Sequence, residues 1–202
     1  MHAPISSYAK RNYLTEKFPP VGDTYISSSE PLINYGNQEK NYLWTSQSKE
    51  YRILLAFKVK NIPDEAILSD VLLTINWFYL PSRIVVNLYL ISSFNESEVF
   101  WKNSPPFSSK IGSFNVTEEE SGPSKWNITS VVNNNGYYYF GLSTSTSTTV
   151  HASIWAKEGT FGFSPKIEIT YYTEDTDIPG FFLFITLLAI ITLIGLRKKL
   201  KK

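Results

Sequence analysis

Five tryptophans lie before the apolar stretch near the end of the chain, at positions 44, 77, 101, 126 and 155. Polar neighbours favour an exposed ring at three of them, Trp44, Trp126 and Trp155. An exposed ring can cover the C–H groups on one face of a pyranose, while nearby amide, carboxylate or guanidinium groups bond its hydroxyls. Arg52 is a candidate for bonding the sugar hydroxyls. Together with the exposed rings it predicts sugar binding. The alternative for any single ring is packing in the core, which fits Trp77 on the apolar face of its segment.

The carboxylates Asp23, Glu30 and Asp70 form a second candidate group. Carboxylate oxygens are ligands that calcium prefers, so these residues are candidates for a calcium site. They show no metal-ligand spacing, and the alternative is solvated charges on outward strand faces. We also expect Arg52 to form a structural ion pair with Asp23 or Glu158. The only cofactor that the sequence suggests is therefore a structural calcium ion.

Catalytic motifs are absent from the sequence. The two histidines are His2 and His151, there is no cysteine, and no Gly-x-Ser-x-Gly, His-Glu-x-x-His or phosphate-binding loop occurs. We therefore predict a non-catalytic protein. A lyase that uses tyrosine as its base and lysine or arginine to neutralise charge would leave no linear motif, so a polysaccharide lyase or hydrolase remains an alternative.

Strands must position these side chains, because the chain before residue 178 shows no helical period. In residues 52–60 the apolar side chains Ile53, Leu55, Phe57 and Val59 alternate with a set that we expect to be largely wet. Turn signals rich in Asn, Gly and Pro separate such runs and join them into antiparallel sheets. We predict an all-β sandwich of about nine strands, at 23–28, 41–46, 52–60, 67–79, 84–91, 110–116, 137–143, 150–157 and 166–173.

Several motifs, in the same order, resemble the DNRLRE-domain family. Residues 23–36 are similar to the family's opening strand and its Asn-Tyr-Gly turn, here Asn34-Tyr35-Gly36, and 52–57 resembles its Arg-x-Leu-Leu-x-Phe strand. The further matching segments are 62–63 with 66–69, Phe100 to Pro105, Trp126 to Thr129, 153–158 and 165–171. The resemblance covers about residues 23–172.

Members of the DNRLRE-domain family are jelly-roll β-sandwiches found on extracellular proteins and beside polysaccharide-degrading enzymes, and some are classed as carbohydrate-binding modules. The resemblance therefore implies a jelly roll that binds polysaccharide or glycan. This sequence departs from the family pattern at three positions: Lys58 stands where the family often has Asp, Phe100 where it has Thr, and Lys157 where it has Arg.

Residues 178–196 carry no charge and are followed by five cations among the six residues 197–202. About twenty apolar residues in a helix, rising about 1.5 Å each, cross a hydrocarbon layer of about 30 Å. We predict a transmembrane helix at 178–196; the alternative, a buried helix of a soluble core, rarely lacks a polar face. Because Glu174, Asp175 and Asp177 precede the helix, the positive-inside rule places the tail 197–202 in the cytoplasm and the domain outside.

The tripeptide Pro179-Gly180-Phe181 resembles the Pro-Gly-Phe sorting signal of archaeal surface proteins, in which the tripeptide is followed by an apolar helix and a basic end. The resemblance implies processing by an archaeosortase, which removes the helix and leaves the protein attached by a lipid. The alternative is a plain helix with Pro and Gly near its first turn.

We expect residues 1–22 to be a leader or linker, 23–173 to be one β-sandwich domain, and 174–177 to be a short stalk. Residues 1–22 contain no apolar run of the kind that a secretory signal requires, so we expect that the sequence starts after a cleaved or mis-assigned N-terminus. The alternative is a tail-anchored protein with a cytosolic domain. The sequons, which suit an exported domain, begin at Asn95, Asn115 and Asn127.

The formal net charge is +1 and the cations before the tail are dispersed, which argues against a nucleic-acid-binding surface. We predict a single-pass cell-membrane protein whose extracellular β-sandwich binds polysaccharide or glycan. The second hypothesis is a structural or adhesive envelope protein that contacts copies of itself or other surface proteins. A large exposed apolar patch or an unpaired edge strand would favour it.

Overall fold

The computed structural model describes residues 11–80, 83–117, 123–144, 150–159 and 162–174. Contacts divide the chain into two compact units, one formed by Tyr13–Tyr172 and the other by the two ends of the chain. In the described part of the second unit, Arg11 Nη2 lies 4.0 Å from Glu174 Oε1.

The apolar segment 178–196, its tripeptide Pro179-Gly180-Phe181 and the basic tail 197–202 lie outside the described residues. Within the described ranges, no helix has the length and apolar character that a membrane crossing requires. The transmembrane helix and the sorting signal therefore stay predictions.

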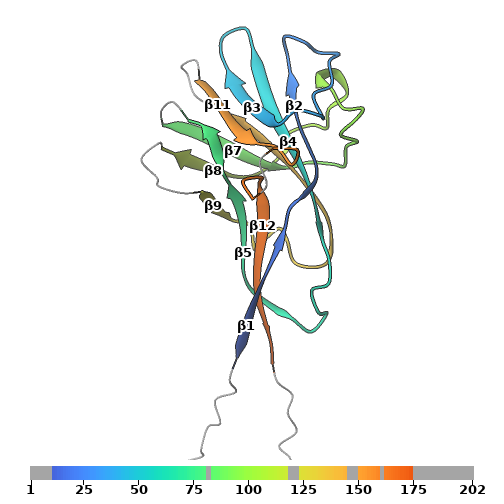
Figure 1. Cartoon of the computed structure of the whole chain (residues 1–202), viewed down its shortest axis with the longest axis vertical. Coiled ribbons are helices and arrows are strands. Elements are labelled where there is room, and N and C mark those ends of the chain that lie inside the picture. The colour runs from blue at the N-terminus through green and yellow to red at the C-terminus, as the bar shows by residue number, and fades with distance from the viewer. Residues whose placement is uncertain (1–10, 81–82, 118–122, 145–149, 160–161, 175–202) are drawn as a thin grey trace, which may run out of the picture. The chain divides into compact units, whose positions relative to one another are not determined.

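Strands make up most of the described chain (Figure 1), and the helical element among the described residues is one short 3-10 turn, η1 (Trp101–Asn103). The strands are β1 (Asn12–Phe18), β2 (Pro20–Ser27), β3 (Lys40–Thr45), β4 (Glu50–Val59), β5 (Ile67–Ile75), β6 (Trp77–Tyr79), β7 (Ile84–Leu90), β8 (Ser109–Val116), β9 (Ser124–Asn127), β10 (Gly136–Thr144), β11 (Val150–Trp155) and β12 (Lys166–Thr173).

These strands form two sheets. The smaller sheet has the order β1-β12-β5-β9, and the larger has the order β6-β11-β3-β4-β10-β7-β8, with β2 also paired to β4. Each pair whose register is described runs antiparallel, for example β10 with both β4 and β7, and β5 with both β12 and β9. Strands that are distant in sequence thus become neighbours, as in a jelly roll. The prediction of an all-β sandwich is confirmed.

One apolar core collects side chains from both sheets. Ile53, Leu55 and Phe57 of β4 have no exposed surface, and neither do Val71 and Leu73 of β5. Alternate side chains of a strand point to opposite faces, so the period of two in the sequence places these residues together on the inner face. Burying a side chain of this size stabilises the fold by about 1.5–3 kcal/mol.

Each predicted strand has a counterpart, but two strands were not predicted. β1 lies within residues 1–22, so the domain begins earlier than the predicted boundary at residue 23. Its first six side chains, Asn12 to Lys17, are exposed and give no apolar alternation to detect. β9 has four residues, which are too few to show a period.

The predicted strand 67–79 is interrupted at Asn76, which separates β5 from β6. Ile67 and Tyr79, at the two ends of this run, share the period of two with the buried Val71, Leu73 and Ile75, which would place them on the inner face as well. Instead Ile67 is 41% exposed and Tyr79 is 48% exposed. The core extends only over the middle of the run, so an apolar residue at the period of two does not by itself indicate burial.

The outer face of β4 was predicted to be largely wet, and this is wrong for Leu54 and Ala56, which are 0% and 4% exposed. Residues 91–108, which we call the β7–β8 connection, contribute Ile91 and Val99 to a second apolar cluster that also contains Leu54 and Ile26 of β2. A loop therefore covers this face (Figure 1). The period within β4 could not show this, because the covering residues are distant in sequence.

Candidate functional site

Trp126, a predicted sugar platform, lies in the core. It is 4% exposed, and its ring stacks on Phe114 with the centroids 4.5 Å apart and the planes at 11°. A ring this buried offers no open face to a sugar, which removes Trp126 from the candidate site. The polar neighbours misled the prediction because Lys125 and Asn127 lie on the opposite, exposed face of β9.

Trp44 belongs to a group of rings around His151, its partner in the register of β3 and β11. The two centroids are 5.0 Å apart, His151 stacks on Tyr42 at 5.5 Å, and Tyr51 lies 5.4 Å from Trp44. Burial lowers the pKa of His151 below its ordinary 6.5, so the imidazole is neutral at pH 7. These rings pack mainly on one another, and the half-buried Trp44 offers only part of its surface to a ligand.

Trp155 has the more exposed aromatic surroundings. Phe78 meets it edge to face at 4.8 Å, and Phe163 lies 6.4 Å away. These two phenylalanines are 46% and 51% exposed. The Lys40 ammonium lies 3.4 Å from the centroid of the Phe78 ring, a cation–π contact. Aromatic rings and a cation therefore lie together at this surface, and the role of Trp155 in sugar binding stays a prediction.

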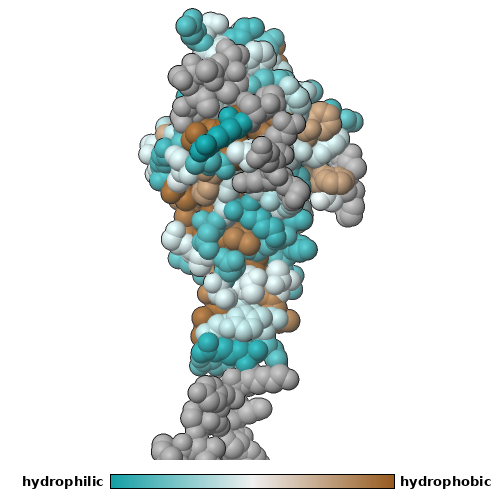
Figure 2. Space-filling view, turned by 90° about the vertical axis from the view of Figure 1, so that its left-hand side faces the viewer, coloured by the Kyte–Doolittle hydropathy of each residue, from teal (hydrophilic) through white to brown (hydrophobic). Residues whose placement is uncertain are grey.

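Large apolar patches would favour a role in packing against other proteins. On the face shown in Figure 2, apolar side chains form small groups with polar ones between them. This face therefore offers no extended apolar contact surface among the described residues.

The sequence suggested that Arg52 pairs with Asp23 or Glu158, but in the structure its partner is Glu50. Its Nε and Nη2 donate to the two carboxylate oxygens of Glu50, at 2.7 and 3.0 Å. The guanidinium also contacts two rings of the β7–β8 connection, with Cζ 4.7 Å from the centroid of Trp101 and 4.9 Å from that of Phe107. Arg52 thus holds this connection to β4 and keeps part of its own surface exposed.

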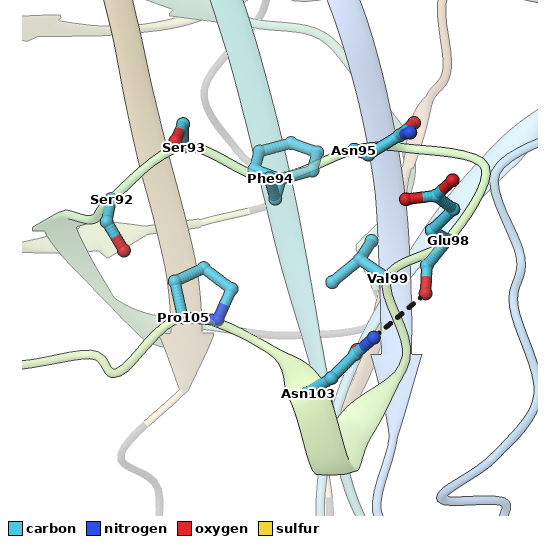
Figure 3. Close-up of a pocket in the computed structure, with 8 residues that line it drawn as sticks. All are labelled: Ser92, Ser93, Phe94, Asn95, Glu98, Val99, Asn103 and Pro105. Atoms are coloured by element: carbon cyan, nitrogen blue, oxygen red, sulfur yellow. Dashed lines mark hydrogen bonds between the residues drawn. The ribbon is translucent and has the colours of Figure 1, made fainter.

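The β7–β8 connection encloses a pocket of about 270 Å³ (Figure 3). In Figure 3 the chain doubles back, so that Ser92 to Asn95 lie opposite Asn103 and Pro105, with Val99 between them. Ser92, Ser93, Asn95 and Asn103 supply hydroxyl and amide groups, and Phe94 supplies the aromatic ring. The arrangement brings hydrogen-bonding groups together beside an apolar surface.

Hydrogen bonds within the connection fix the walls of this pocket. Asn103 Nδ2 donates to the carbonyl of Glu98 at 3.0 Å, and Asn103 Oδ1 accepts from the N–H of Phe100 at 2.7 Å. Asn95 Oδ1 accepts from both the N–H and the hydroxyl of Ser97. The Phe94 ring packs edge to face on Tyr139 at 5.9 Å. The pocket is therefore formed before any ligand arrives.

A second, larger hollow of about 660 Å³ has a different character. Lys17, Lys157 and Lys166 line it, together with the carboxylate of Glu158. Lys17 and Lys166 lie 3.9 and 3.6 Å from Glu168, which also pairs with Lys125 at 3.5 Å. Among the described residues that line this hollow, cations outnumber carboxylates and none is aromatic.

The predicted calcium ligands are not brought together. Glu30 accepts a hydrogen bond from the Tyr35 hydroxyl, and Asp70 Oδ1 accepts one of 2.8 Å from Asn127. Asp23 instead lies beside Glu96 and Glu158, and one oxygen of each of these three carboxylates lies within 4.8 Å of the others. Burial raises the pKa of Asp23 to about 6, against the opposing effects of the neighbouring Asn41 amide and the Lys157 N–H.

Comparison with known protein families relates the chain to one of them. A family model described as carbohydrate-binding module family 96 matches residues 14–171. The chain belongs to this family. The match extends from β1 to β12 and agrees with the carbohydrate-binding jelly roll that the DNRLRE resemblance implied. None of the curated proteins compared with the chain matches it.

The three sequons of this family-96 module are all exposed. Asn95 lines the pocket, Asn115 lies on β8 opposite Val85, and Asn127 donates to Asp70. Exposure is necessary for glycosylation but does not show it, so modification at Asn95, Asn115 and Asn127 stays a prediction.

Several residues of the module's candidate site were not predicted from the sequence. Phe94 and Asn103 of the pocket and Glu96 of the carboxylate group lie in the β7–β8 connection, which has no strand or helix period. One signal was available, since Phe100 to Pro105 matched a motif of the resembled family. That motif identified the segment but gave none of its residues a role.

Proposed function

We propose that this family-96 module binds polysaccharide or glycan in the pocket of the β7–β8 connection (Figure 3). The supporting observation is the composition of the pocket, in which the half-buried Phe94 ring can cover the C–H face of a sugar ring while the side chains of Ser92, Ser93, Asn95 and Asn103 bond its hydroxyls. Its volume of about 270 Å³ suits a single sugar ring. The pocket would therefore recognise a single sugar unit, either within a polysaccharide or at its end.

Arg52 belongs to the same proposed surface. It contacts the connection through Trp101 and Phe107, and Trp101 lies in the same 3-10 turn as Asn103 of the pocket. Two of its guanidinium nitrogens are engaged by Glu50, which holds the group in place. A polysaccharide that extends from the pocket over this turn would meet an oriented guanidinium.

Trp155, with Phe78 and Phe163, and the partly exposed Trp44 are proposed as secondary platforms for a longer ligand. Trp155 lies on β11, Trp44 on β3, Phe78 on β6 and Phe163 between β11 and β12, so none of them belongs to the connection. Their contribution can be separated from that of the pocket by substitution, because they share no lining residue with it.

The test is a glycan array and a polysaccharide pull-down with the full chain, purified in a mild detergent because residues 178–196 are apolar. Phe94→Ala and Asn95→Ala should weaken binding by about 0.5–1.5 kcal/mol each, the usual worth of a lost contact or hydrogen bond. Asn115→Ala is the matched control, since it removes another exposed sequon asparagine away from the pocket. It should leave binding unchanged.

Other outcomes would redirect the proposal. Binding that survives Phe94→Ala but is lost in Trp155→Ala would move the sugar site to the Trp155 patch. No binding to any sugar, together with concentration-dependent self-association, would favour the structural or adhesive envelope role. Turnover of a bound polysaccharide would contradict the proposed non-catalytic role and favour a lyase or hydrolase.

We propose that residues 178–196 attach the module to the cell membrane, with the domain outside and residues 197–202 in the cytoplasm. The uncharged segment and the following five cations support this arrangement. In the producing cell, the full chain should stay in the membrane pellet after alkaline carbonate extraction, and a chain ending at residue 177 should not. A membrane-bound form whose mass lacks the residues after 181 would support archaeosortase processing at Pro179-Gly180-Phe181.

A further inference from the structure

Three carboxylates meet at one point although they come from distant parts of the chain. Asp23 lies on β2, Glu96 in the β7–β8 connection and Glu158 in the turn after β11, and one oxygen of each lies within 4.8 Å of the other two. Like charges repel at such separations, more strongly where burial reduces solvent screening. A group of this kind therefore needs compensation by a positive charge.

Lysine supplies only part of the compensation. Lys157 Nζ lies 3.0 Å from Glu96 Oε2 and also contacts Glu158 Oε1. One ammonium against three carboxylates leaves two negative charges uncompensated within the group. A divalent cation would supply the missing charge.

Two buried polar side chains beside the carboxylates point to the same conclusion. Asp23 is 1% exposed; its Oδ2 accepts the N–H of Lys157 at 2.8 Å, while its Oδ1 has no hydrogen-bond partner in the part of the chain that the structure describes. Asn41, also 1% exposed, lies beside the Asp23 carboxylate and lowers its pKa, but neither Oδ1 nor Nδ2 of Asn41 makes a hydrogen bond of ordinary geometry within the described residues. Buried polar atoms are almost always satisfied, by protein, water or an ion.

Hydrogen bonds and close backbone contacts hold Glu96 and Glu158 in place. Asp23 N–H donates to Glu96 Oε1 at 2.8 Å, which orients that carboxylate. Asn34 Nδ2 bonds the carbonyl of Glu96 at 2.6 Å, and a Cβ on Gly36 would lie 2.5 Å from the same carbonyl oxygen. Gly159 likewise lets the turn that carries Glu158 approach the carbonyl of Glu39, since a Cβ there would lie at 2.8 Å.

We infer that Asp23, Glu96 and Glu158, beside the buried side chain of Asn41, form a binding site for calcium. The three donors are carboxylate oxygens, which suit a hard cation and not zinc or copper. Calcium fits better than magnesium because it accepts irregular sets of protein oxygens, whereas magnesium requires a strict octahedron and retains water. The site differs from the predicted group in Glu30 and Asp70, which the structure places elsewhere.

The experiment is isothermal titration calorimetry of the full chain in detergent, after chelator treatment, with calcium chloride and then magnesium chloride and without sugar. We expect one calcium ion per chain, weaker magnesium binding, and a thermal unfolding midpoint that rises with calcium concentration. Glu158→Gln removes a ligand at the surface and should weaken calcium binding by at least about tenfold. Asp23→Asn should weaken it similarly if the variant folds.

Glu30→Gln and Asp70→Asn are matched controls, since each removes a carboxylate outside the group, and both should bind calcium like the unmodified chain. Lys157→Met should bind calcium more tightly, because the ammonium competes for Glu96 and Glu158. The inference is overturned if the folded chain takes up no calcium at millimolar concentration, or if Glu158→Gln binds it unchanged. Because no sugar is present, these results are independent of the proposed carbohydrate site.

Discussion

The side-chain amide of Asn34 donates a hydrogen bond of 2.6 Å to the carbonyl oxygen of Glu96. The same nitrogen bonds the carbonyl oxygen of Val99 at 2.7 Å, and Asn34 Oδ1 accepts from the N–H of Gly36. One side chain therefore fixes both its own turn and a segment 62 residues further along the chain. That segment carries Glu96 of the proposed calcium site and Val99 of the pocket wall.

Gly36→Ala should disturb this junction. The new Cβ would lie 2.5 Å from the carbonyl oxygen of Glu96 and 2.8 Å from the Cγ of Glu96. The backbone at residue 36 or residue 96 must therefore shift. We expect a loss of about 1–3 kcal/mol in unfolding free energy, measured by urea denaturation. Gly136→Ala is the control, because its Cβ would meet nothing closer than 3.8 Å. Equal stability of the two variants would contradict the described approach of the two segments.

Trp126→Ala should act on stability and not on recognition. The ring is buried against Phe114, so its loss should cost about 3–5 kcal/mol in urea or thermal unfolding. Trp155→Ala, at a half-buried ring beside exposed neighbours, should cost clearly less. Sugar binding by the folded fraction of the Trp126 variant should match that of the unmodified chain; a specific loss of affinity at full folding would return Trp126 to the binding site.

Arg52→Lys tests the contact between β4 and the β7–β8 connection. Lysine keeps the charge but cannot reproduce two parallel bonds to Glu50 or the planar contacts with Trp101 and Phe107. We expect the unfolding free energy to fall by about 1 kcal/mol. Lys110→Arg, a similar exchange at an exposed position, should have no effect. An unchanged unfolding free energy in Arg52→Lys would show that the guanidinium geometry does not contribute to stability.

His151 should make stability depend on pH. Burial lowers its pKa in the folded state below 6.5, so between the two values the unfolded chain binds more protons than the folded one. Its contribution is therefore complete above about pH 6.5 and decreases as the pH falls from there toward the folded pKa. Urea denaturation of the unmodified chain and of His151→Gln, compared from pH 5 to 8, isolates the contribution of His151 to the unfolding free energy.

An NMR titration checks the His151 pKa directly. His2 is the other histidine, so a His2→Ala variant assigns the remaining imidazole signal. A His151 signal that titrates at or above pH 6.5 would contradict burial by the rings of Tyr42 and Trp44.

The strands could be predicted because the alternation of apolar and polar residues is visible within each short segment of the sequence. Ile53, Leu55 and Phe57 are separated by single residues, and each is fully buried. The same rule failed where burial depends on distant residues. Leu54 is covered by the β7–β8 connection, and no pattern within β4 contains that information.

The candidate site shows the same division. Asp23 was predicted as a metal ligand from its residue type, but its neighbours Glu96 and Glu158 are 73 and 135 residues away in the chain and are joined to it only by the fold. Trp126 was misplaced because polar neighbours along a strand describe the other face. Residue type therefore suggests what a side chain can do, and strand register decides with which partners it does so.

The β7–β8 connection has two kinds of position. Ile91 and Val99 are buried against the sheet, while Ser92, Ser93 and Asn95 are exposed at the pocket. Substitutions at Ser92 and Ser93 leave the apolar attachment intact, so the ligand preference of the proposed sugar pocket should change by mutation with little loss of folding stability. The connection is thus a place where new specificities can evolve, or be selected from a library, on an unchanged sandwich.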